Sequence, residues 1–361
     1  MKRTTKTLTF LGIGALFTMG SLTACANNGD GGGGEGGGGD GSGAKIALLL
    51  PESKTTRYEA YDRPLFEDKI AELGDYEVLY SNADQDAAKQ QQQAESALAS
   101  GIAVMVLDPV DADAAVSIVN AAKAQDVPVV SYDRLINSPD LDYYISFDNE
   151  QVGNLQGQAL VDKLTEDGAT GGVLMVNGAP TDGNAKLFKE GAHSVIDSSD
   201  FTVLAEYDTP DWSPDRAQEW VAGQLTQFSG QIAGVYAAND GTAGGAVAAM
   251  KAANIDPWPV VTGQDAELSA IQRIVAGDQF MTVYKAYKAE AELAAEVAVK
   301  LANGETVEGD TDTDGVPTTL LTPVVVTVDN IMDTLIADEY VTVDDICTAE
   351  YADACAAAGI Q

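Results

Sequence analysis

Residues 45–81, KIALLLPESKTTRYEAYDRPLFEDKIAELGDYEVLYS, contain the repeating unit from which the fold of this chain can be predicted. The continuous apolar run at 45–50 predicts a buried strand, 57–73 has the spacing of a helix, and 77–81 predicts a second strand. Short apolar strands joined by helices are typical of a parallel sheet that is covered on both faces. The stretch therefore predicts an α/β fold with right-handed crossovers.

The same alternation continues after residue 81 and starts again after a long predicted helix at 151–164. The first series adds predicted strands at 104–107, 127–132 and 143–147 and predicted helices at 87–100 and 112–124. The second series has predicted strands at 172–176, 202–207, 234–237 and 260–263, and helices at 185–196, 214–227, 241–252 and 266–276. A helix at 289–301 and a strand at 320–328 follow. Two series in a body of this length predict two doubly wound lobes.

The first 43 residues are typical of an export signal followed by a tether. Three basic residues precede an apolar run at 8–19, which is typical of a secretory signal peptide, here ending at residue 24. Leu22-Thr23-Ala24-Cys25 resembles a bacterial lipobox, so Cys25 is expected to be lipidated, and residues 26–43 are mostly glycine. We therefore expect a lipoprotein anchored to the outer face of the cell membrane. An ordinary secretory cleavage site is the alternative.

The chain is strongly acidic, with 20 Lys and Arg residues against 56 Asp and Glu residues and a formal net charge of −36. This charge argues against nucleic acid and against an anionic ligand. A neutral ligand fits better, although salt adaptation or colloidal stability explains most of the charge equally well.

Polar residues follow four of the predicted strands, at 131–134 (SYDR), 148–149 (DN), 239–240 (ND) and 263–265 (GQD). Ligands of open α/β sheets bind beyond the carboxyl ends of the strands, so these groups are expected in one crevice. Carboxylates, amides and a guanidinium suit the hydroxyls of a sugar, with helix N-caps as the alternative for each position. Tyr58 and Trp212 are candidates for packing against the apolar face of a sugar ring, and core packing is their alternative.

Six stretches of the body match one known family in order and spacing: 132–136 (YDRLI), 144–149 (YISFDN), 182–188 (DGNAKLF), 239–246 (NDGTAGGA), 263–266 (GQDA) and 281–285 (MTVYK). With these stretches the chain resembles the D-xylose-binding periplasmic proteins, a branch of the type I periplasmic binding proteins of ABC sugar importers. The resemblance implies a sugar held between two lobes that close about a three-crossover hinge. It also implies a monomer whose closed form is recognised by an ABC permease. It implies lobes of 44–149 plus 282–320 and of 150–281 plus 321–361.

The ligand residues implied by the resemblance come from both lobes. With Tyr58 added as an aromatic candidate, they are Arg57, Tyr58, Asp133, Arg134, Asn149, Asn184, Trp212, Asn239, Asp265 and Lys285. The first loop, 51–58, is similar to relatives that accept several monosaccharides, whereas 239–242 is similar to xylose-specific members. D-xylose is therefore expected, and glucose, galactose and arabinose stay open. Presentation of the sugar to a chemoreceptor or sensor kinase is the alternative to transport.

The remaining sequence features do not favour catalysis, a cofactor or a metal site. The single histidine, His193, is expected on the surface of a helix, so no enzyme is expected. Cys347 and Cys355 predict a C-terminal disulfide in an exported protein, with two free thiols as the alternative. Residues 310–315 open like a calcium loop, but Leu321 stands where a glutamate ligand is required, which favours an acidic turn. The glutamines at 90–93 are expected on a solvated helix face.

Overall fold

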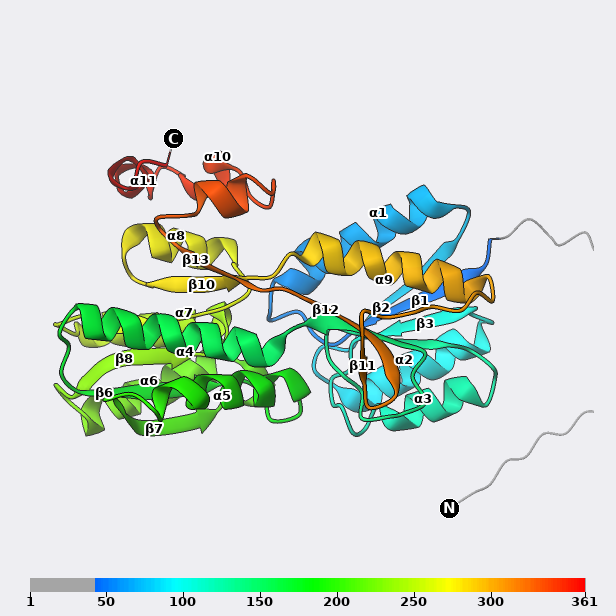
Figure 1. The fold of residues 1–361 in the computed structure, drawn as a ribbon, viewed down its shortest axis with the longest axis horizontal. Coiled ribbons are helices and arrows are strands. Elements are labelled where there is room, and N and C mark those ends of the chain that lie inside the picture. The colour runs from blue at the N-terminus through cyan, green and yellow to red at the C-terminus, as the bar shows by residue number, and fades with distance from the viewer. Residues whose placement is uncertain (1–42, 361) are drawn as a thin grey trace, which may run out of the picture. The chain divides into compact units, whose positions relative to one another are not determined.

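The computed structural model describes residues 43–360, which form two α/β lobes and a small C-terminal cap (Figure 1). The predicted signal peptide, Cys25 and residues 26–42 of the tether lie outside this range. Among the described residues, no helix is both long and apolar enough to cross a membrane. The predicted α/β fold with two doubly wound lobes is confirmed.

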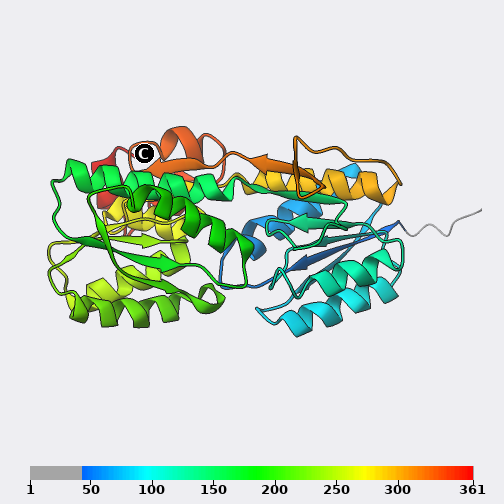
Figure 2. The ribbon, with the colours of Figure 1, turned by 60° about the horizontal axis from the view of Figure 1, so that its bottom comes forward.

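The first lobe is built on a seven-stranded sheet of order β11-β12-β5-β4-β3-β1-β2, parallel except for the β11–β12 pair. Its strands are β1 (Lys45–Leu50), β2 (Glu77–Asn82), β3 (Val104–Leu107), β4 (Val129–Tyr132), β5 (Tyr143–Phe147), β11 (Thr311–Thr313) and β12 (Val316–Leu321). Its helices are α1 (Arg63–Leu73), α2 (Ala87–Ala99), α3 (Val116–Lys123) and α9 (Tyr287–Ala302), and a π-helical turn, η1 (Tyr58–Asp62), precedes α1. Helices α1 and α9 pack on one face, and α2 and α3 on the other (Figure 2).

The second lobe has a four-stranded parallel sheet of order β7-β6-β8-β9. Its strands are β6 (Gly172–Asn177), β7 (Thr202–Asp208), β8 (Ile232–Ala237) and β9 (Val260–Val261). Its helices are α4 (Asn149–Glu166), α5 (Gly183–Ile196), α6 (Pro214–Gln227), α7 (Asp240–Ala253) and α8 (Leu268–Ala276), with a 3-10 turn η2 (Pro210–Trp212). Helices α4 and α5 cover one face of the sheet, while α6 and α7 cover the other.

Three segments connect the lobes. The chain leaves the first sheet after β5, returns before α9, and crosses again between β12 and β13 (Val324–Thr327). Strand β10 (Met281–Tyr284) pairs antiparallel with β13, and Met281 and Val283 pack in the second lobe. We therefore propose that the second lobe extends to Tyr284, three residues beyond the sequence-based boundary.

The local signals explain most element bounds. Five consecutive buried residues make β1 a central strand, as its sequence predicts. The side chain of Asp86 caps α2 by accepting hydrogen bonds from two backbone N–H groups, and Pro214 occupies the first turn of α6. Asn239 caps α7 in a capping box with Thr242.

Three local predictions are wrong. The strand predicted at 320–328 is two strands in different sheets, because Pro323 between them has no amide hydrogen for a ladder. The helix predicted at 112–124 begins at Val116, since Asp111 forms a turn by accepting from the N–H groups of Asp113 and Ala114. Gln90 is buried rather than solvated, because its amide bonds the backbone of Asp108 and Val110.

Two other sequence features have local roles. The ring of His193, with 27 % of its side chain exposed, lies between the carboxylates of Asp197 and Glu206. The acidic segment at 310–315 belongs to the β11–β12 hairpin, where Asp312 accepts a hydrogen bond from the Gly315 N–H at 2.8 Å.

The C-terminal cap, residues 331–360, contains a π-helical turn, η3 (Met332–Ile336), and two short helices, α10 (Val343–Ile346) and α11 (Ala352–Ala358). The cap packs on α8 and buries its own apolar side chains there. A disulfide joins Cys347 to Cys355 within the cap.

Candidate functional site

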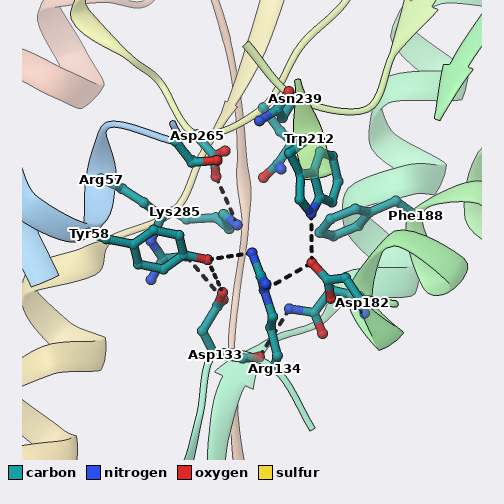
Figure 3. Close-up of a pocket in the computed structure, with 13 residues that line it drawn as sticks. Arg57, Tyr58, Asp133, Arg134, Asp182, Phe188, Trp212, Asn239, Asp265 and Lys285 are labelled. Atoms are coloured by element: carbon teal, nitrogen blue, oxygen red, sulfur yellow. Dashed lines mark hydrogen bonds and ion pairs between the residues drawn. The ribbon is translucent and has the colours of Figure 1, made fainter. Parts of the chain in front are cut away.

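Residues of both lobes line a small cavity between them (Figure 3). The carboxyl ends of the parallel strands of both lobes point to it, which is where open α/β sheets bind ligands. The lining residues are Thr55, Arg57, Tyr58, Asp133, Arg134, Asp182, Asn184, Phe188, Trp212, Asn239, Gln264, Asp265 and Lys285.

Arg57 is the most heavily paired cation of this site. Its Nε and Nη2 donate to the carboxylate of Asp62 at 2.8 and 2.7 Å, and Nη2 also donates to Glu290 at 2.6 Å. Its Nη1 donates to Asp133 Oδ1 at 3.0 Å. These contacts use four of the five guanidinium N–H groups, so Arg57 mainly orients Asp133 and has one N–H left for a ligand.

Asp133 follows β4 and is held as an anion. Burial alone would raise the pKa of its carboxyl, but Arg57, Lys285 and Arg134 lower that pKa below its ordinary value. Behind it, burial raises the pKa of Glu290 despite the contact with Arg57. Of the two carboxyl groups of Asp133 and Glu290, the one that carries the negative charge is therefore that of Asp133, in the cavity wall.

Tyr58 and Arg134 extend the same network. The Tyr58 hydroxyl donates to Asp133 Oδ2 at 3.2 Å and accepts from Arg134 Nη2 at 3.0 Å. The guanidinium carbons of Arg57 and Arg134 lie 5.2 and 5.7 Å from the centroid of the Tyr58 ring. The ring is thus fixed by two cations and a carboxylate at the edge of the cavity.

A buried acid stands behind Arg134. Asp108 Oδ1 lies 3.6 Å from Arg134 Nε, and neither oxygen of Asp108 has a hydrogen-bond partner among the described residues. Burial raises the pKa of this carboxyl well above its ordinary value.

The opposite wall is aromatic and comes from the second lobe. Trp212 Nε1 donates to Asp182 Oδ2 at 3.0 Å, and the Phe188 ring lies edge-on to Trp212 with centroids 6.3 Å apart. A Cβ on Gly178 would come within 2.0 Å of the indole ring, so only glycine lets Trp212 lie against the chain after β6. Figure 3 shows both rings on the side of the cavity opposite Tyr58.

Two amides add hydrogen-bonding groups. Asn239 uses its Oδ1 to cap α7, accepting from Thr242 N at 2.9 Å, and its Nδ2 donates to no described residue. Gln264 is 2 % exposed, and its Oε1 has no hydrogen-bond partner among the described residues. One amide therefore offers donors to the cavity and the other an acceptor.

Asp265 and Lys285 form an ion pair at the second-lobe side of the hinge. Lys285 Nζ lies 2.9 Å from Asp265 Oδ1, and both side chains are 3 % exposed. The Tyr287 hydroxyl donates to both Asp265 Oδ1 and Asp265 O at 2.9 Å. The carboxylate is thereby fixed in direction, with its Oδ2 free of described partners.

Two more acids lie behind Asp265. Burial and the negative charge of Asp265 raise the pKa of Glu267 to about 7. Burial and the neighbouring Glu267 raise the pKa of Asp240 to about 8. The Glu267 carboxylate also accepts from the backbone N–H of Thr56, which belongs to the first lobe, at 3.4 Å. These acids are not in the cavity wall.

Three lining residues have backbone conformations that L-residues rarely adopt. Asp133, Trp212 and Asp265 have φ values of 55°, 52° and 102°. Such conformations cost free energy and persist where the surrounding structure holds them, most often in functional sites. Their concentration in one cavity supports a binding role.

The cavity is balanced in charge although the chain is not. Three carboxylates (Asp133, Asp182, Asp265) face three cations (Arg57, Arg134, Lys285) in its wall. The chain as a whole carries −36. A site of this kind suits a neutral ligand that offers many donors and acceptors.

The structure brings nine of the ten predicted site residues to the cavity wall. Asn149 is the exception: it is the first residue of α4, and its Nδ2 donates to Ser146 Oγ at 3.0 Å. The sequence-based set missed four lining residues, Thr55, Asp182, Phe188 and Gln264. Two signals were available, since Asp182 and Phe188 stand at the ends of the quoted stretch 182–188 and Gln264 precedes Asp265.

Comparison with known proteins gives a consistent result. Residues 46–306 match the family described as "Periplasmic binding protein domain". The D-xylose-binding periplasmic protein of Escherichia coli is 38 % identical over 297 residues, which cover 80 % of this chain and 88 % of that protein. A multiple sugar-binding periplasmic protein of Azospirillum brasilense is 35 % identical over 279 residues, covering 71 % and 78 %.

A solved structure is similar in fold and in sequence. The carbohydrate transporter solute-binding protein of Chloroflexus aurantiacus, in complex with D-glucose, superposes with a TM-score of 0.76 at 30 % identity. The alignment covers 83 % of this chain and 97 % of that one.

Proposed function

This chain belongs to the type I periplasmic binding protein family that includes the D-xylose-binding receptors, and on that premise we propose that it captures D-xylose for an ABC importer. Members of this family are extracytoplasmic solute receptors and not enzymes. The sugar is held between the two lobes, and the closed form delivers it to a permease.

The observation that carries the proposal is the charge-balanced, aromatic-walled cavity shared by the lobes. Asp133 and Asp265 present fixed carboxylate oxygens, and Arg134 and Lys285 present cationic donors. Sugar hydroxyls both donate and accept, so each can bond a carboxylate and a cation at once. The indole of Trp212 supplies a flat apolar surface for the carbon–hydrogen face of the sugar ring.

Nine residues of the sequence-based set stay in the proposed ligand set: Arg57, Tyr58, Asp133, Arg134, Asn184, Trp212, Asn239, Asp265 and Lys285. Asn149 leaves the set, because its side chain bonds Ser146 and does not line the cavity. Gln264 joins it, because the residue lies in the cavity wall with 2 % exposure and its Oε1 has no hydrogen-bond partner among the described residues. An unpaired buried acceptor is costly unless a ligand hydroxyl meets it.

D-xylose is the first choice among monosaccharides. Support comes from the 38 % identity to the Escherichia coli D-xylose-binding protein and from the shared stretch at 239–242. The similarity to multiple sugar-binding and glucose-bound proteins keeps D-glucose as the first competitor.

Calorimetry and thermal shift with D-xylose, D-glucose, D-galactose, L-arabinose and D-ribose test the proposal. A ligand at a hundredfold excess over its Kd adds about 2.7 kcal/mol to the free energy of unfolding, which gives a clear shift in Tm. We expect D-xylose to give the largest shift. The Asp265→Ala variant should lose most of the binding, and no shift with any of the five sugars would refute sugar capture.

We further propose that Cys25 is lipidated and that residues 26–43 tether the receptor to the outer face of the membrane. The lipobox-like sequence 22–25 and the glycine-rich composition support this anchor. Labelling of cells with an alkyne fatty acid should mark the native chain and leave a Cys25→Ser variant unlabelled. Equal labelling of both would contradict lipidation at Cys25.

A further inference from the structure

The C-terminal cap, residues 331–360, lies beyond the family match at 46–306 and has its own apolar core. Its residues Leu335, Ile346 and Cys355 are buried together with Ile271 and Ile274 of α8. The cap is therefore firmly seated on the second lobe, beside the loop that carries Asp265.

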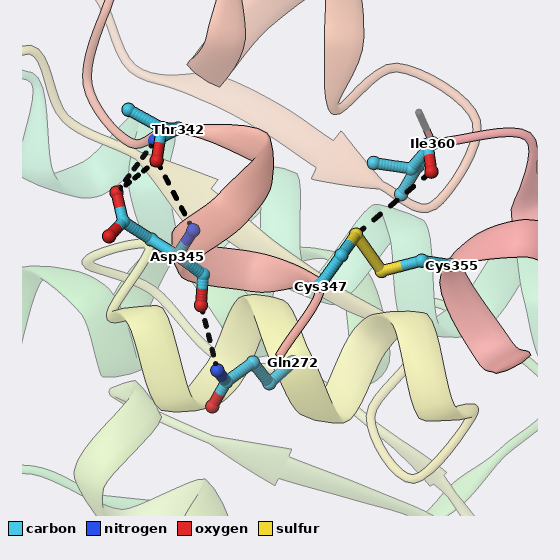
Figure 4. The surroundings of a disulfide bond; sticks show 6 residues. All are labelled: Gln272, Thr342, Asp345, Cys347, Cys355 and Ile360. Carbon is cyan, nitrogen blue, oxygen red and sulfur yellow. Dashed lines mark hydrogen bonds between the residues drawn. A yellow bond between two sulfur atoms is a disulfide. The ribbon is translucent and has the colours of Figure 1, made fainter. Parts of the chain in front are cut away.

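Polar contacts fix the cap on α8 and fix its internal shape (Figure 4). Gln272 of α8 donates from Nε2 to the carbonyl of Asp345 at 3.1 Å. Asp345 and Thr342 form a capping box at the start of α10, and the disulfide Cys347–Cys355 closes the following loop. The chain just before α10 is thereby held in place, and Tyr340 is part of it.

Tyr340 joins the cap to the first lobe. Its ring stacks on Tyr61 of η1, with centroids 4.7 Å apart and an interplanar angle of 18°. It also lies 5.0 Å from the ring of Tyr284 in β10 and 6.0 Å from that of Tyr287 at the start of α9. Tyr61 packs with the first lobe and Tyr340 with the second, so this stack spans the two lobes.

Tyr340 also reaches the cavity wall from behind. Its hydroxyl donates to the carbonyl of Asp265 at 3.3 Å, the same oxygen that accepts from Tyr287 at 2.9 Å. Asp265 has a φ of 102°, a conformation that needs outside support. Two tyrosine hydroxyls, one from each lobe, hold its carbonyl in this conformation.

We propose that Tyr340 is a positioning residue through which the C-terminal cap orients Asp265 and latches the second lobe to Tyr61 when the lobes close on a sugar. This inference rests on the sugar-binding function proposed above. Opening of the lobes breaks the Tyr61–Tyr340 stack, so the latch slows release of the sugar and leaves its capture unchanged.

The test measures association and dissociation of D-xylose and D-glucose by stopped flow, using the full chain. Tyr340→Phe keeps the ring and removes the hydroxyl, and loss of one hydrogen bond predicts about a fivefold faster dissociation. Tyr340→Leu also removes the stack and predicts a rise of about thirtyfold. Association rates should stay at the native value.

Tyr351→Phe is the matched control, because Tyr351 lies in the same cap and its hydroxyl bonds no described residue. It should leave the dissociation rate unchanged. A Tyr340→Phe variant with native dissociation overturns the positioning role, even if the Tm of the sugar-free protein falls. If the native chain binds neither sugar, both this inference and the proposed ligand fail, whereas native binding with unaltered variants refutes the latch alone.

Discussion

Arg134 of the first lobe and Asp182 of the second form an ion pair across the cavity, with Nε 3.0 Å from Oδ2 and both side chains 3 % exposed. The same Asp182 oxygen accepts the indole N–H of Trp212 at 3.0 Å, and its Oδ1 caps α5 through Asn184 N at 2.8 Å. One carboxylate thus joins the lobes, orients the aromatic wall and starts a helix.

Asp182→Asn should weaken sugar binding and spare the fold. Its Oδ1 can still cap α5, but an Nδ2 group would face the donors of Arg134 and Trp212. Breaking a buried charge pair costs about 2 kcal/mol or more, which predicts a rise in Kd of at least about thirtyfold by calorimetry. Asp148→Asn, at the cap of α4 and away from the cavity, is the control. A native Kd in Asp182→Asn would contradict a role in closure.

Trp212→Ala should raise the Kd for the sugar by about thirtyfold, because truncating a central aromatic anchor costs about 2 kcal/mol. Trp212→Phe should be intermediate, since it keeps an apolar ring and loses the hydrogen bond to Asp182. Trp220, which stacks on Tyr207 outside the cavity, gives the matched control Trp220→Phe. Equal affinities in all three variants would place the sugar elsewhere.

Arg57→Met should destabilise the fold itself. It leaves Asp62, Asp133 and Glu290 close together and buried without their shared cation. Removing one partner from a buried charge cluster costs about 3–5 kcal/mol, measurable by urea unfolding at pH 7. The exposed pair Arg216–Glu219 supplies the control Arg216→Met, for which less than about 0.5 kcal/mol is expected. Similar losses in both variants would argue against the cluster.

Glu267 makes stability fall as the pH rises. Its pKa is about 7 in the folded protein against an ordinary 4.5, because of burial and the charge of Asp265. Between these values the unfolded chain releases a proton that the folded chain keeps, so the contribution of Glu267 to the free energy of unfolding decreases with pH and levels off above about 7. Glu267→Gln cannot titrate and should remove up to about 1.4 kcal/mol per pH unit of that decrease.

Urea unfolding between pH 4.5 and 8 measures the effect as the difference between native and variant protein. The exposed Glu219→Gln serves as the control variant. A Glu267→Gln profile that also parallels the native one would show that this carboxyl titrates normally in the fold.

The disulfide should stabilise the cap through the unfolded state. Cys347 and Cys355 are separated by 8 positions, and closing a loop of this size predicts about 2.5 kcal/mol lost in Cys347→Ser/Cys355→Ser. Native protein under reducing conditions should unfold like the double variant in urea. Native stability after reduction would contradict the prediction.

Local sequence predicted the strands and helices well where one rule dominated. The run at 45–50 is apolar throughout and became a strand with the predicted bounds, and Pro214 marks the start of α6. The predictions failed where a contact distant in sequence decided the outcome. The strand predicted at 320–328 was divided between two sheets, and Gln90 was buried by the loop after β3.

Prediction of the site residues also failed where contacts between residues distant in sequence decide the position of a side chain. Polar residues at strand ends pointed to the cavity because chain order and sheet topology bring those ends together. Asn149 also follows β5, yet its side-chain amide donates a hydrogen bond to Ser146 Oγ, and the residue does not line the cavity. Phe188 lies one turn into α5, where its direction depends on how α5 packs.

The two-lobed α/β fold, the family and most of the residues around the cavity could be predicted from the amino-acid sequence, because apolar runs and strand-end motifs are local properties of the chain. Three sets of contacts could not be predicted in this way: Asp182 bridges the lobes, Arg57 pairs with three carboxylates, and Tyr340 of the cap donates a hydrogen bond to the carbonyl of Asp265. Each of these contacts joins residues that are brought together by packing alone, so no pattern of neighbours in the sequence encodes it.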